Sequence, residues 1–148
     1  MSATSIETAS AAETEAVGAQ LAAGLEPGDA VLLTGELGSG KTTLVRGACR
    51  ALGIAEPVTS PTFTLGQTYI RREALVSHLD LYRLGDLGDE DPGLLDDYLA
   101  PDRVAFVEWP GEGTGAALLD GVRVVARVRL EHGGGDRRTI TVERPERS

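Results

Sequence analysis

The stretch Gly35-Glu-Leu-Gly-Ser-Gly-Lys-Thr42 has the residue types that bind the phosphates of a nucleotide. It matches the pattern G-x-x-x-x-G-K-(S/T) at every fixed position, and it lies between an apolar run and a helical pattern, as that motif requires. Glycines let backbone N–H groups turn inward around an anion, and the N-terminus of the following helix adds partial positive charge. The sequence therefore predicts a phosphate-binding loop rather than an ordinary flexible glycine loop.

The residues of this loop have distinct expected roles. Lys41 would supply charge to the β- and γ-phosphates, the Thr42 hydroxyl would bind Mg²⁺, and Thr43 would face the α- or β-phosphate. Lys41 is also the only lysine of the chain, among 14 basic residues, which favours a specific role for it. The expected nucleotide contacts of the loop are Gly35, Glu36, Leu37, Gly38, Ser39, Gly40, Lys41, Thr42 and Thr43.

Two acidic residues stand at the ends of predicted strands. Glu108 follows the apolar run 104–107, and Asp80 lies near the carboxyl end of the run 74–81. Acids at the carboxyl ends of neighbouring parallel strands meet at one edge of the sheet, where they can hold a metal and orient water. We expect Glu108 to bind Mg²⁺ and polarise the attacking water, the alternative being a rim carboxylate paired with an arginine. We expect Asp80 to orient the metal or the water, the alternative being a turn carboxylate that accepts backbone N–H groups.

Several other residues each have two interpretations. Thr62 either senses the γ-phosphate through its hydroxyl or belongs to a rigid proline turn. Trp109 either packs over the nucleotide or caps the core. Arg83 is expected to pair with the acidic residues that follow it rather than to neutralise charge in a transition state. The acidic run 86–102 is either a solvated face or a docking surface for a basic partner.

The cysteine and the two histidines are expected to be structural. Cys49 is interpreted as a small core residue, His78 as a half-exposed strand residue and His132 as a loop residue. A single cysteine excludes an internal disulfide framework and a cysteine-based zinc site. Because the chain has no asparagine and one lysine, it lacks the usual N-K-x-D motif for reading guanine, which argues against a GTPase of the familiar kind.

The spacing of apolar residues predicts the elements that position these groups. Ser10-Ala-Ala-Glu13 is a capping box that begins a helix of about four turns, and residues 44–52 form a second helix ended by Gly53. Strands are expected at 30–34, 65–70, 74–81 and 104–107, a short helix at 93–99, and an antiparallel hairpin with one wet face at 122–130 and 138–143. The fold class is α/β, a P-loop NTPase-like three-layer fold with a mainly parallel sheet and an antiparallel C-terminal hairpin.

Composition limits where such a protein acts and what it binds. With 148 residues, 41% of them hydrophobic, the chain is expected to form one soluble domain over residues 1–148. Residues 1–40 contain no lysine or arginine and no run is long enough to span a membrane, so we expect a cytoplasmic protein without membrane association. The net charge of −9 argues against direct binding of DNA or tRNA.

The motifs taken together resemble those of the TsaE (YjeE) family, small P-loop ATPases of bacterial tRNA threonylcarbamoyladenosine synthesis. The resemblance rests on residues 35–43, Ser60-Pro-Thr-Phe-Thr-Leu65, His78-Leu-Asp-Leu-Tyr-Arg-Leu84, Asp97-Tyr98 and Val107-Glu-Trp-Pro110. It implies that Lys41, Thr42 and Thr43 bind ATP and Mg²⁺ and that Glu108 is the Walker B-like acid. It implies further that Asp80 and Trp109 support hydrolysis.

The resemblance also implies partners. TsaD- and TsaB-type proteins would transfer the threonylcarbamoyl group to tRNA, while this ATPase drives turnover of the complex and meets tRNA only indirectly. The chain departs from the family pattern at Gly111-Glu112, where a glutamate often follows Glu-Trp-Pro directly, and in the acidic, glycine-rich stretch 85–95. Two rival functions remain open on the residues: a small-molecule kinase with Arg71-Arg72 in its lid, and a nucleotide-dependent binding module that does not hydrolyse ATP.

Overall fold

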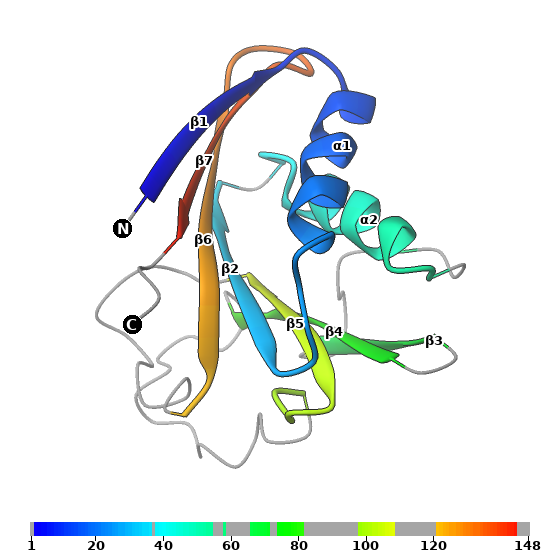
Figure 1. Ribbon diagram of the computed structural model, residues 1–148. Coiled ribbons are helices and arrows are strands. Elements are labelled where there is room, and N and C mark those ends of the chain that lie inside the picture. Colours follow the sequence, from blue (N-terminus) through cyan, green and yellow to red (C-terminus); the bar gives the residue numbers. More distant parts are fainter. Residues whose placement is uncertain are drawn as a thin grey trace.

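A computed structural model gives the arrangement of the chain (Figure 1). It describes residues 2–36, 38–54, 58, 66–71, 74–81, 98–108 and 121–144. In chain order, the elements are β1 (Ser2–Thr8), α1 (Ala11–Ala22), β2 (Asp29–Gly35), α2 (Lys41–Ala51), β3 (Gly66–Arg71), β4 (Ala74–Asp80), β5 (Arg103–Glu108), β6 (Arg123–His132) and β7 (Arg138–Arg144).

The strands form one sheet in the order β1-β7-β6-β2-β5-β4-β3. Its four central strands, β6, β2, β5 and β4, run parallel, whereas β3, β7 and β1 pair antiparallel with their neighbours. The predicted mainly parallel sheet with an antiparallel C-terminal hairpin is confirmed. One strand was not predicted: β1 pairs with β7, so it depends on residues at least 130 positions away rather than on a local apolar pattern.

The local signals that predicted the helices and the hairpin are visible in the structure. The Ser10 hydroxyl accepts the Glu13 N–H at 3.2 Å, and the Glu13 carboxylate accepts the Ala9 N–H at 2.9 Å, which together begin α1. Along β6, Arg127 and Arg129 are exposed and the alternate residues are buried, as the wet-face prediction requires. Most of the predicted helix 93–99 lies outside the described residues, and Tyr98 and Leu99 form a turn.

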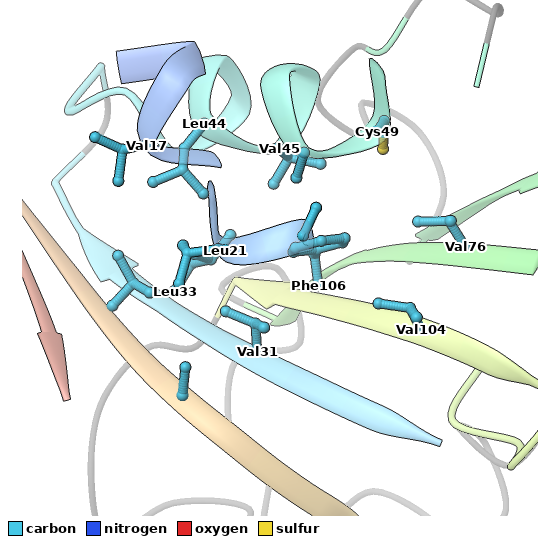
Figure 2. Close-up of a cluster of buried hydrophobic side chains, with 14 of the residues drawn as sticks. Val17, Leu21, Val31, Leu33, Leu44, Val45, Cys49, Val76, Val104 and Phe106 are labelled. Carbon is cyan, nitrogen blue, oxygen red and sulfur yellow. The ribbon is translucent and has the colours of Figure 1, made fainter. Parts of the chain in front are cut away.

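Both described helices cover the same face of the sheet (Figures 1 and 2). Leu44 and Val45 from α2 and Val17 and Leu21 from α1 pack on a layer of strand side chains that includes Phe106. Cys49 belongs to this core, as predicted, and burial raises the pKa of its thiol to about 12. Neither described helix is long and apolar enough to cross a membrane.

Two glycines let α1 and α2 approach each other closely. A Cβ atom on Gly18 would stand 2.0 Å from the Leu44 carbonyl oxygen, and one on Gly47 would stand 2.0 Å from the Glu15 carbonyl oxygen. Any larger residue would push the helices apart, because a backbone atom cannot yield as a flexible side chain does. This contact sets the position of α2, whose N-terminus carries the predicted phosphate-binding loop.

Candidate nucleotide-binding and hydrolysis site

The predicted phosphate-binding loop connects β2 to α2 and leaves the N-terminus of α2 uncapped. Its N-cap residue is Gly40, which has φ 105° and no side chain that could accept the first helical N–H groups. Gly38 is also left-handed, with φ 77°, so the turn needs glycine at both positions. Because Gly40 provides no side-chain cap, the partial positive charge at the N-terminus of α2 favours an anionic ligand there.

Lys41, the only lysine, lies buried at the first position of α2. Its Nζ donates to the Gly35 carbonyl oxygen at 2.5 Å and stands 4.0 Å from Glu108 Oε1. Only 8% of the residue is exposed, and this burial lowers the pKa of its ammonium group, against the opposing charges of Glu108 and Asp80. A desolvated cation of this kind gains strongly from contact with phosphate oxygens.

The two predicted acids meet at the carboxyl edge of the sheet. Asp80 and Glu108 are direct partners in the register of β4 and β5, and both are buried. Glu108 contacts Lys41 and His78, and no arginine pairs with it among the described residues. The structure thus brings Lys41, Asp80 and Glu108 together, and among the described residues it buries Glu108 beside Lys41 and His78 rather than beside an arginine.

His78 is the site residue that the sequence interpretation missed. It was expected to be half-exposed, but none of its surface is accessible, and its Nε2 lies 2.9 Å from Glu108 Oε2. The expectation failed because β4 lies inside the sheet, between β5 and β3, where even alternate residues are covered. A signal was present: His78 and Asp80 are two residues apart, so they lie on the same face of β4.

The hairpin of β6 and β7 also reaches the loop. Arg138 Nη2 donates to the Gly38 carbonyl oxygen at 3.0 Å. His132, predicted in a loop, is instead the last residue of β6, and its ring lies 3.7 Å from where a Cβ on Gly38 would stand. Beside this contact lies a cavity of about 330 Å³ between the end of β1, the start of α1 and the hairpin. Its lining residues are Glu7, Thr8, Ala9, Glu13, Gly133, Arg137, Arg138 and Thr139.

Comparison with known proteins identifies the family. The family model described as "Threonylcarbamoyl adenosine biosynthesis protein TsaE" matches residues 8–140. The chain belongs to the TsaE family. It is 38% identical to the TsaE protein of Bacillus subtilis over 131 residues, covering 87% of this chain and 78% of the relative. It is 40% identical to that of Streptomyces coelicolor over 122 residues, covering 81% and 80%.

A solved structure agrees with this assignment. The crystal structure of YdiB from Bacillus subtilis superposes with a TM-score of 0.70 at 31% identity, covering 95% of this chain and 84% of that one. The predicted TsaE family and the predicted α/β fold class are therefore both confirmed. Membership in TsaE places the chain in tRNA threonylcarbamoyladenosine biosynthesis.

The residues of this TsaE chain fit a magnesium ion bound together with nucleotide. Mg²⁺ usually takes one or two protein oxygens and completes its shell with phosphate oxygens and water. Thr42, at the start of α2, and Glu108, at the end of β5, would hold it. Among the described residues, no three His, Cys, Asp or Glu side chains are grouped so that they could hold a metal ion by themselves.

Some predicted site residues lie outside the described residues. These are Leu37, Thr62 and Trp109 among the expected nucleotide contacts, together with Arg83, residues 86–97 of the acidic run and the departures at 85–95 and 111–112. Their roles stay predictions.

Proposed function

We propose that the protein binds Mg·ATP and hydrolyses it as the ATPase component of threonylcarbamoyladenosine synthesis. The observation that carries the proposal is the buried Lys41 ammonium group, which stands between the carbonyl of Gly35 and the carboxylate of Glu108. A loop that presents a desolvated cation at a helix N-terminus favours phosphate, and an acid beside that cation favours chemistry on the phosphate.

The cavity beside the loop is a candidate binding site for the nucleoside part of ATP. Its volume is of the size that small ligands fill, and Arg138 joins it to the loop at Gly38. We propose that the phosphates bind along residues 35–43 while adenine and ribose extend toward Thr8 and the hairpin. This arrangement also explains why the adenine contacts have no contiguous sequence motif: three separate elements line the cavity.

The reaction assigns a step to each side chain at the carboxyl edge. A water oxygen forms a bond to the γ-phosphorus while the bond from that phosphorus to the β,γ-bridging oxygen breaks, which yields ADP and phosphate. Glu108 would accept a hydrogen bond from the attacking water and Lys41 would neutralise charge on the γ-phosphate oxygens. Asp80 would orient the acid and the water from the neighbouring strand. Bound Mg²⁺ supplies further positive charge to the phosphates, held by Thr42 and Glu108.

We propose that this hydrolysis resets a complex of TsaD- and TsaB-type proteins in the cytoplasm. The net charge of −9 supports a protein that meets tRNA through its partners rather than directly. P-loop enzymes that lack a supplied arginine hydrolyse at roughly 10⁻⁴ to 10⁻² per second. We therefore expect slow turnover by the chain alone and faster turnover in the complex.

The deciding experiment measures phosphate release from Mg·ATP by the chain alone and with the TsaD- and TsaB-type partners. We expect partner-stimulated release that falls at least about 100-fold in Glu108→Gln, with ATP binding retained and detected by the fluorescence of the single tryptophan. Transfer of the γ-phosphoryl group to an acceptor other than water would instead indicate the small-molecule kinase. Full function of Glu108→Gln in cells, with loss in Lys41→Ala, would indicate the non-hydrolytic binding module.

A further inference from the structure

His78 is a fully buried histidine, two residues before Asp80 and on the same face of β4. His78 pairs in register with Phe106, and the preceding pair on the same face is Val76 with Val104. Those three neighbours belong to the apolar core under the helices, so an aliphatic side chain would suit this position. Burying a polar ring there costs free energy unless it makes a hydrogen bond. The ring therefore needs an explanation beyond filling space.

The hydrogen bond of this ring goes to the proposed catalytic acid. His78 Nε2 lies 2.9 Å from Glu108 Oε2. A carboxylate only accepts, so Nε2 carries the proton and donates it. The other ring nitrogen, Nδ1, is buried and has no partner among the described residues. Among the described residues, the only hydrogen-bond partner of the His78 ring is thus Glu108.

This contact divides the two oxygens of Glu108 between different neighbours. Oε2 accepts from His78, while Oε1 faces Lys41 Nζ at 4.0 Å. The longer contact exceeds hydrogen-bond distance, so it attracts the carboxylate without fixing its rotation. Among the contacts of Glu108 with described residues, the His78 bond is the directional one, and it holds Oε1 toward the loop where the phosphates would bind.

We propose that His78 is a positioning residue that fixes the Glu108 carboxylate in the orientation needed for hydrolysis. The inference rests on the proposed function, because it assigns Glu108 the role of orienting water. Its alternative is a purely structural histidine, whose loss would lower stability without selectively lowering the rate. A positioning role predicts that loss of His78 lowers the hydrolysis rate, whereas a structural role predicts that it lowers the stability.

Three variants of the full chain separate these alternatives. His78→Leu removes the donor, His78→Gln keeps an amide N–H at about the position of Nε2, and Ser77→Ala is a matched change at the neighbouring buried residue, whose Oγ has no partner among the described residues. In single-turnover hydrolysis of Mg·ATP, we expect His78→Leu to lower the rate about 10- to 100-fold. We expect its ATP dissociation constant to stay within about twofold. His78→Gln should recover part of the rate, and Ser77→Ala should match the wild type.

A spectroscopic measurement tests the hydrogen bond without hydrolysis. The chain has two histidines, so a ¹⁵N-edited spectrum of the imidazoles shows two rings, with exposed His132 as the reference. In the nucleotide-free protein, we expect an Nε2–H resonance of His78 that exchanges slowly with solvent and shifts in Glu108→Gln. A resonance of His78 that does not change in that variant would overturn the inference.

The kinetic outcomes distinguish this inference from the proposed function. Wild-type rates in His78→Leu, while Glu108→Gln is inactive, would overturn the inference alone. Equal losses of rate in His78→Leu and His78→Gln, accompanied by equal losses of thermal stability, would also overturn it in favour of a structural role. Wild-type hydrolysis by Glu108→Gln would overturn the proposed function, and this inference would fail with it.

Discussion

A buried charged residue lies at each end of β2, and the two residues have different surroundings. At the amino end, the carboxylate of Asp29 accepts from Arg123 Nε at 2.5 Å and from the Glu26 N–H at 2.9 Å. At the carboxyl end, Lys41 Nζ stands 4.0 Å from Glu108, and the Ser39 hydroxyl is buried without a partner among the described residues.

This difference distinguishes a partly solvated ion pair from the buried charge of the candidate site. Each oxygen of Asp29 has a donor, and the Arg123 side chain is 59% exposed, so water solvates the cation. The Lys41 side chain is only 9% exposed, and burial lowers its pKa. An ion pair whose cation is solvated stabilises the fold locally, whereas a desolvated cation gains more from contact with an anionic ligand.

Removing the lysine at the carboxyl end should have the largest effect. We expect Lys41→Met to weaken ATP binding at least about 100-fold, because no other lysine can replace its charge on the phosphates. Isothermal titration with ATP and Mg²⁺ measures the loss. Binding within about threefold of the wild type would mean that the buried charge at the carboxyl end of β2 does not serve a phosphate ligand.

The same variant gives a pH dependence with a definite sign. Because the pKa of Lys41 in the folded protein is lowered from 10.5, the unfolded chain holds this proton more tightly. Stability is therefore lost below the folded pKa and recovered as the pH rises from it toward 10.5. In nucleotide-free urea denaturation between pH 7 and pH 10, the wild type should gain stability relative to Lys41→Met. A constant difference would contradict the assignment.

The helix contact that supports the loop offers a second test, of intermediate size. We expect Gly47→Ala to lower the free energy of unfolding by about 3 kcal/mol, because its Cβ would stand 2.0 Å from the Glu15 carbonyl oxygen. Gly24→Ala is the matched control, since nothing lies within 4 Å of its Cβ position. Urea denaturation measures both variants. ATP affinity should fall with stability in Gly47→Ala, and equal stability of the two variants would refute the contact.

Changing the amino end of β2 should have the smallest effect and leave the site intact. We expect Asp29→Asn to cost about 1 kcal/mol of stability, because the Arg123 pair is half solvated and an amide oxygen still accepts. Its hydrolysis rate should equal that of the wild type. The isosteric change Glu108→Gln, on β5 beside the carboxyl end of β2, should show the reverse pattern. A loss of activity in Asp29→Asn beyond about threefold would remove the distinction between the ends.

The local part of this protein was predictable from the sequence. The strand, loop and helix around residues 35–43, the capping box at Ser10 and the strand-end positions of Asp80 and Glu108 were predicted. They depend on contiguous residues and on alternation along a strand, which a sequence displays directly. The family followed from the order and spacing of these motifs, and the comparisons confirm it.

Only the tertiary structure decided which of these residues touch. His78 meets Glu108 across 30 residues, and Arg138 meets Gly38 across 100. Such contacts depend on strand register, since a shift by one residue would turn His78 to the opposite face. They depend also on the strand order. His78 is buried because β4 lies between β5 and β3, and β1 finds its partner in β7 at the other edge of the sheet. Residue types and spacing carry the chemistry, whereas long-range packing decides which charges are buried together and how strongly they interact.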